Sequence, residues 1–165
     1  MDSIISLNNI QKTYSIGQVV VNVLQSIILK INKNDFVVIT RSSGLGKTTL
    51  MNIIGCLDTP TSGEYYLNNQ LVSGLGDDEL AGIRNKEVGF VFQTFYLLSR
   101  YNALENVMLS LIYAGVNKND RIARAEPMFE IVGLKDRIHH KPNELSGGQR
   151  QRVAIARAHI NVPLA

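Results

Sequence analysis

Apolar and polar positions alternate near the start of the chain and give way to apolar runs further on. The alternation Ile5-Ser6-Leu7-Asn8 predicts a half-buried strand. The runs at residues 36–40 and 87–92 are nearly unbroken and are typical of strands covered on both faces. Together with β-branched and turn-bounded segments, the pattern predicts strands at residues 4–14, 19–21, 27–31, 36–40, 64–67 and 87–92.

Helical spacing of apolar positions dominates the second half of the chain. Helices are predicted from the Gly-rich stretch to about residue 57, over 77–85, twice within 103–138, and over 150–160. Asp77 is the expected N-cap of the second helix. Pro127 falls inside the helix expected over 121–132, where the missing N–H predicts a kink or break.

Composition narrows the class of protein. The 165 residues, 45% hydrophobic and 19% charged, suffice for one domain with a core. The net charge of +3 comes without a long basic run, so we expect no nucleic-acid partner. The single cysteine, Cys56, fits a reducing cytosol and is expected to be a buried apolar residue. No signal peptide or membrane-span-length run is apparent, so a membrane role would require a partner.

A Gly-rich stretch between the predicted strand 36–40 and a predicted helix indicates a phosphate-binding loop, comprising Arg41, Ser42, Ser43, Gly44, Leu45, Gly46, Lys47, Thr48 and Thr49. Backbone N–H groups of such a turn attract phosphate oxygens, and Lys47 adds a full charge. The Thr48 hydroxyl suits Mg²⁺. Arg41 stands where the pattern has glycine, and a left-handed backbone there would cost about 1–2 kcal/mol. The alternative is a Gly-rich turn before an ordinary helix.

A second motif, Leu145, Ser146, Gly147, Gly148 and Gln149, precedes a basic amphipathic helix. A serine and two glycines at a helix start form another potential anion-binding N-terminus. The alternative is a helix cap followed by a solvated basic face.

With both motifs in this order, the chain resembles the ATP-binding subunit of an ABC transporter over essentially all its residues. Residues 50–63 and 88–93 look most like the macrolide-export and lipoprotein-release branch. The resemblance implies an α/β fold of the P-loop NTPase type, with a mainly parallel sheet, an N-terminal antiparallel β subdomain and a helical subdomain. It divides the chain into a nucleotide-binding core (1–93), a helical subdomain (94–144) and the signature motif with its helix (145–165).

The resemblance also implies the site, with ATP and Mg²⁺ as cofactors. Tyr14 would stack on adenine, and residues 41–49 would hold the phosphates, with Lys47 contributing to catalysis. Thr48 and Gln93 would contact Mg²⁺, and Gln93 would also position the attacking water. Residues 145–149 would contact the ATP held by the opposite subunit of a head-to-tail dimer, as a homodimer or with a paired subunit. An integral membrane permease, and in some systems a membrane-fusion adaptor, would hold the subunit on the inner face of the cell membrane.

The chain departs from the family pattern at its C-terminal side. No acidic residue follows Glu144 and no histidine follows His159, so the family's Walker B, D-loop and H-loop residues have no counterparts, including the general base. We therefore expect poor ATP hydrolysis. The family strand that neighbours residues 36–40 also has no counterpart, which predicts an exposed edge and exposed apolar faces there.

Three interpretations follow from these residues. The first is an export-type ABC transporter subunit that couples ATP binding and hydrolysis to a permease. The second is a non-catalytic nucleotide-binding fragment, favoured by Arg41 and the missing acids. The third is a non-transport ABC ATPase, such as one serving cell division, against which the loop at residues 58–63 argues mildly. A P-loop kinase or GTPase would leave residues 145–149 unexplained.

Overall fold

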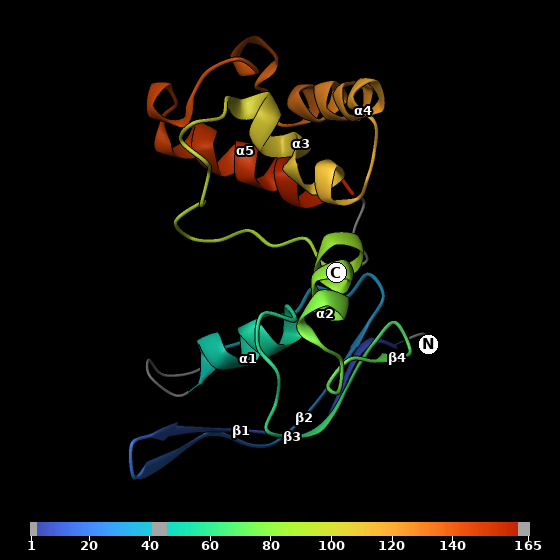
Figure 1. Cartoon of the computed structure of the whole chain (residues 1–165), viewed down its shortest axis with the longest axis vertical. Coiled ribbons are helices and arrows are strands. Elements are labelled where there is room, and N and C mark those ends of the chain that lie inside the picture. Colours follow the sequence, from blue (N-terminus) through green and yellow to red (C-terminus); the bar gives the residue numbers. More distant parts are fainter. Residues whose placement is uncertain (1–2, 41–45, 162–165) are drawn as a thin grey trace. The chain divides into compact units, whose positions relative to one another are not determined.

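The computed structural model describes residues 3–40 and 46–161, apart from the Ile16 side chain. The chain forms two compact units, the first ending at Arg84 and the second beginning at Asn85 (Figure 1). This division precedes the predicted boundary after residue 93. The helix that follows the second motif belongs to the second unit, with the other helices of the predicted helical subdomain.

The first unit is built on a four-stranded antiparallel sheet with the order β2-β1-β3-β4. Its strands are β1 (Ser3–Ile16), β2 (Val19–Asn32), β3 (Ser62–Leu67) and β4 (Gln70–Leu71). The strands predicted at 4–14 and 64–67 are confirmed. Those predicted at 19–21 and 27–31 merge into β2, because pairing with β1 continues through the intervening residues despite register shifts.

Two helices complete the first unit's secondary structure. Helix α1 (Lys47–Ile54) buries Leu50 and Ile53, and the loop after it buries Cys56, as predicted. Helix α2 (Asp77–Glu87) crosses from the first unit into the second. The predicted N-cap Asp77 is wrong, because Asp77 is already the first helical residue; instead the Gly76 amide donates to Glu79 Oε2 at 3.0 Å.

The strands predicted at residues 36–40 and 87–92 are also wrong. Glu87 ends α2, and the rest of both segments is irregular. Phe36 is 94% exposed and Val38 is 66% exposed, which agrees with the expected exposure of apolar faces there. A strand requires a hydrogen-bonded neighbour, and neither segment has one among the described residues. The sheet that the structure describes is therefore antiparallel, without the parallel strands of the predicted core.

The second unit is helical. It contains α3 (Ala103–Tyr113), α4 (Lys118–Ile131) and α5 (Gly147–His159), with short 3₁₀ turns at Lys135–Arg137 and Pro142–Glu144. Helix α3 packs against both α4 and α5. The buried side chains at the centre of this packing come from all three helices and include Val107, Leu111, Phe129 and Val153. The two helices predicted within residues 103–138 from the 3.6-residue spacing are thus confirmed.

Pro127 lies inside α4 without breaking it, so of the predicted kink or break the break is wrong. The helix runs without interruption from Lys118 to Ile131 around it. Proline removes one hydrogen bond and crowds the preceding turn. Burial of Ala125 and Phe129 on the inner face of α4 explains why the helix persists despite that cost.

Replacing Pro127 with alanine is expected to raise the free energy of unfolding by about 1–3 kcal/mol, because it restores a helix hydrogen bond without disturbing the core. Pro127 is exposed, so no buried contact is lost. Chemical denaturation compared with Glu126→Ala, an exposed neighbour in the same helix, checks this. A gain no larger than that of the control would contradict the prediction.

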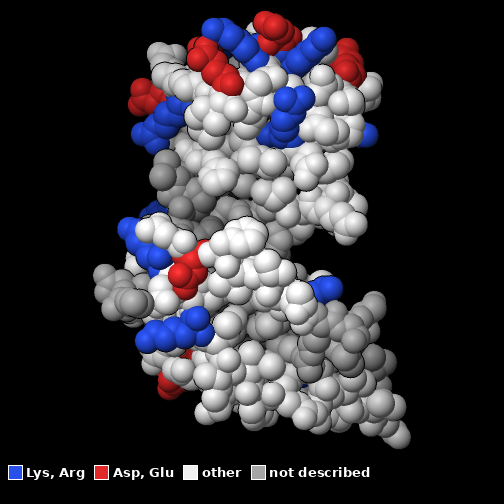
Figure 2. Space-filling model, turned by 180° about the vertical axis from the view of Figure 1, so that it is seen from behind, with Lys and Arg blue, Asp and Glu red and all other residues white. Residues whose placement is uncertain are grey.

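Charged side chains of both signs are interspersed on the face shown in Figure 2, most densely over the helical unit. That distribution agrees with the mild net charge of +3. Among the described residues, no helix combines the length and apolar character needed to cross a membrane.

Candidate functional site

The predicted phosphate loop meets α1 at Gly46. Arg41, Ser42, Ser43, Gly44 and Leu45 lie outside the described residues. Gly46 has φ 82° and ψ 8°, a left-handed conformation that favours glycine. No side chain caps the helix and no acidic residue lies in its first turn. Within residues 3–40 and 46–161, no side-chain acceptor contacts the first-turn amides, which is the arrangement that suits an anion.

Gly46 also lies tightly against β2. A Cβ on this residue would lie 2.8 Å from the Val23 carbonyl oxygen and 2.9 Å from Leu24 Cδ2. Both distances are too short for real contacts, so the start of α1 is fixed against the strand only because position 46 lacks a side chain.

The side chains that follow Gly46 are accessible. Lys47 and Thr48 are exposed, while Thr49 is half-buried. The described residues contain no cluster of three His, Cys, Asp or Glu side chains that could hold a metal ion. Mg²⁺ binding would therefore depend on phosphate oxygens, with the Thr48 hydroxyl as a protein ligand; this role and the phosphate contact of Lys47 remain predictions.

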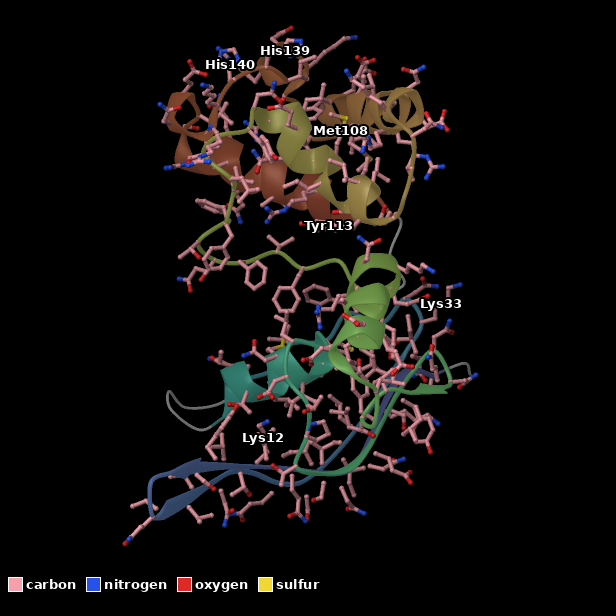
Figure 3. All side chains as sticks on the ribbon, in the orientation of Figure 1. Lys12, Lys33, Met108, Tyr113, His139 and His140 are labelled. Carbon is pink, nitrogen blue, oxygen red and sulfur yellow. The ribbon has the colours of Figure 1, made fainter. Side chains whose placement is uncertain are left out.

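Tyr14 lies near the end of β1 in a polar cluster that sequence reasoning missed. Its side chain is 38% exposed, and its hydroxyl donates to Asp58 Oδ2 at 2.7 Å. Lys12 Nζ donates to Asp58 Oδ1 at 2.6 Å and to the Thr59 carbonyl at 2.7 Å. The same ammonium lies 5.0 Å from the centre of the Tyr14 ring. The Lys12 side chain points from β1 towards the side of the strand on which α1 lies (Figure 3).

The pKa values in this cluster shift in directions that preserve these contacts. Burial acts to raise the pKa of Asp58, but hydrogen bonds from Lys12, Tyr14 and the Thr59 amide outweigh it and lower the pKa. Burial and the hydrogen bond to Asp58 raise the pKa of Tyr14. At neutral pH the carboxylate is thus ionised and the tyrosine hydroxyl keeps its proton to donate.

The second motif forms the N-terminus of α5. Ser146 is the N-cap: its Oγ accepts from the Gln149 amide at 3.3 Å, and Gln149 Oε1 accepts from the Ser146 amide at 2.8 Å. Leu145 is buried, while Gly147 and Gly148 are exposed in the first helical turn rather than ahead of it. The capping box uses the Gln149 side chain and leaves the two glycine amides pointing out of the helix end.

Gln93 is exposed at the start of a loop that is held firmly by two residues the sequence did not single out. Arg157 of α5 donates to the Phe95 and Tyr96 carbonyls at 2.7 and 2.8 Å. The Asn106 side chain is fully buried, accepts from the Leu98 amide at 2.7 Å and donates to three carbonyls of residues 98–102. The predicted site residues therefore fall into two groups: Tyr14 and residues 46–49 in the first unit, Gln93 and residues 145–149 in the second.

Comparison with known protein families gives a match to the ABC transporter family over residues 24–164. An uncharacterized ABC transporter ATP-binding protein of Bacillus subtilis, YknY, is 55% identical over 159 residues, which is 96% of this chain and 69% of the relative. The macrolide export ATP-binding/permease protein MacB of Syntrophobacter fumaroxidans is 51% identical over 162 residues, covering 97% of this chain but 23% of that protein.

Solved structures give the same result for the fold. The dimeric ATP-binding cassette MJ0796, in a post-hydrolysis state bound to ADP and Pi, matches with a TM-score of 0.88 at 46% identity. The match covers 96% of this chain and 70% of the cassette. The predicted fold class, a P-loop NTPase-type α/β domain with antiparallel and helical parts, is thereby confirmed.

Proposed function

Because this chain belongs to the ABC transporter family, we propose that it binds ATP with Mg²⁺ as the ATP-binding subunit of an export-type transporter. The observation that carries the proposal is the N-terminus of α1, which no side chain of the described residues caps and where left-handed Gly46 is followed by the exposed Lys47 and Thr48. Helix amides and the Lys47 ammonium would bind the phosphates, and Thr48 would ligate Mg²⁺. When bound, the metal would neutralise phosphate charge.

The partners follow from the relatives. The structure of a similar cassette is dimeric, and the MacB relatives are ATP-binding/permease proteins. We therefore propose a head-to-tail dimer in which residues 145–149 contact the nucleotide held by the partner subunit. The two glycine amides at the start of α5 are suited to that phosphate contact. A permease partner would place the subunit on the inner face of the membrane, with an adaptor as a further component.

Hydrolysis is a separate matter from binding. Arg41 stands where the phosphate-loop pattern has glycine. The second candidate, a non-catalytic nucleotide-binding fragment, is favoured by the same observation. Turnover that depends on Lys47 would exclude it.

The test is ATP binding by the purified chain, with Mg²⁺, beside Lys47→Ala. Removal of the ammonium is expected to raise the Kd for ATP at least about tenfold, which corresponds to about 1.4 kcal/mol. Lys33→Ala is the matched control: it removes one exposed charge in the same unit, at the turn after β2 (Figure 3), and should leave the Kd unchanged. Equal Kd values for the wild-type and Lys47→Ala chains would overturn the proposal.

A further inference from the structure

The side chains of Lys12, Tyr14 and Asp58 form a hydrogen-bonded cluster. The family resemblance assigns a role to Tyr14 but none to Lys12 or Asp58. Both carboxylate oxygens of Asp58 are engaged, one by the Tyr14 hydroxyl and the other by Lys12 and the Thr59 amide. Three donors thus converge on one carboxylate, which links β1 to the loop that follows α1.

We propose that Asp58 and Lys12 are positioning residues that hold the Tyr14 ring with one face free for the adenine of ATP. This inference rests on the proposed ATP binding and deepens it. The new element is the pair of residues that orient the Tyr14 ring. Stacking of adenine on Tyr14 is itself part of the proposed function.

The geometry distinguishes the two faces of the ring. The Lys12 ammonium lies over the ring at 5.0 Å from its centre, a cation–π distance that occupies one face. Tyr14 is nevertheless 38% exposed, so part of the ring remains open to solvent. A planar base can stack only on the face that Lys12 does not cover.

The ion pair that sets this orientation is shielded from water. The Lys12 and Asp58 side chains are 12% and 26% exposed, and their atoms lie 2.6 Å apart. The Asp58 backbone is itself fixed, because its amide donates to the Asn52 carbonyl of α1 at 3.3 Å. The Tyr14 hydroxyl is thus tied to the helix whose N-terminus would hold the phosphates. Pre-ordering the ring in this way removes an entropic cost of binding the base.

The experiment compares the affinity for MgATP with that for magnesium tripolyphosphate, which lacks the base, by calorimetry on the full chain. Asp58→Ala and Lys12→Met are each expected to lower the affinity for MgATP relative to that for magnesium tripolyphosphate about two- to tenfold. The reason is that binding of the base would then have to order one side chain, that of Tyr14. In a Tyr14→Ala background, Asp58→Ala should change the ratio no further, because its effect passes through the ring. The Tyr66 hydroxyl donates to Glu64 Oε2 at 3.3 Å, so Glu64→Gln is a matched tyrosine–carboxylate control that should leave the ratio unchanged.

The outcomes separate this inference from the proposed function. If Tyr14→Ala lowers the ratio and Asp58→Ala does not, positioning by Asp58 is overturned and adenine stacking stands. If Asp58→Ala weakens both ligands equally, its role is structural only and the inference is again overturned. If the wild-type chain does not bind ATP, or Tyr14→Ala leaves the ratio unchanged, stacking on Tyr14 fails and the inference fails with it.

A second measurement needs no nucleotide. With ¹³Cζ-labelled tyrosine, the Tyr14 resonance is the one absent from Tyr14→Phe. Burial and the hydrogen bond to Asp58 raise the pKa of Tyr14, so Asp58→Ala should move the titration midpoint towards that of ordinary tyrosine. An unchanged midpoint would show that the hydroxyl is not held by Asp58 and would overturn the inference.

Discussion

Gly46→Ala is expected to abolish measurable ATP binding and to lower the free energy of unfolding of the first unit by about 2–5 kcal/mol. Two penalties combine at this position. A left-handed φ costs a residue with a Cβ about 1–2 kcal/mol, and overpacking against a fixed neighbour costs about 1–3 kcal/mol. At Gly46 the φ is 82° and the obstructing atom at 2.8 Å is a backbone carbonyl of β2, which cannot rotate away.

The effect on binding follows from the same contact. Relief of the clash requires the start of α1 to move away from β2, and the first-turn amides and Lys47 would move with it. Gly17→Ala is the matched control, because Gly17 has φ 62° but no atom within 4 Å of the position that a Cβ would take. It should show the conformational penalty alone and retain the wild-type Kd for ATP. Denaturation and ATP titration of both variants check this; equal losses would contradict a packing role for Gly46.

Elements whose cues lie close together in the sequence were predictable. The basic amphipathic pattern after Gln149 indicated α5, although the helix begins at Gly147 rather than at residue 150. The alternation at Ile5–Asn8 indicated β1. The helical spacing after residue 103 indicated α3 and α4. In each case the residues that form the element's hydrogen bonds or its buried face lie within a few positions of one another in the sequence.

Features that depend on distant partners were not predictable. The apolar run at residues 36–40 has the composition of a buried strand, yet strand formation depends on a neighbour that no local pattern specifies. The contact between Tyr14 and Asp58 joins residues 44 positions apart, and only the fold brings them together. Lys12 and Tyr14 could be placed on one face of a strand from their spacing, but not against Asp58.

Asn106→Leu is expected to lower the free energy of unfolding of the helical unit by about 3–5 kcal/mol. Leucine has a similar size but no polar atoms, so the Leu98 amide and the Tyr101 carbonyl would lose the partner that Asn106 supplies. The Leu98 and Asn102 carbonyls would keep their backbone donors, the Tyr101 and Asn106 amides. Each buried polar group left unpaired costs about 1–3 kcal/mol. Hydrogen exchange at the Leu98 amide should accelerate more than exchange in the middle of α3, because the loop opens before the helix unfolds.

Asn119→Leu, at an exposed position of α4, provides the control for a change of asparagine to leucine and should leave both stability and the Leu98 exchange rate unaltered. The comparison bears on function through Gln93, which begins the same loop. Arg157 holds the loop at the Phe95 and Tyr96 carbonyls, and Asn106 holds it at residues 98–102. If Leu98 stays protected in Asn106→Leu, the Arg157 contacts alone fix the loop, and the conformation around Gln93 is set from α5 rather than from α3.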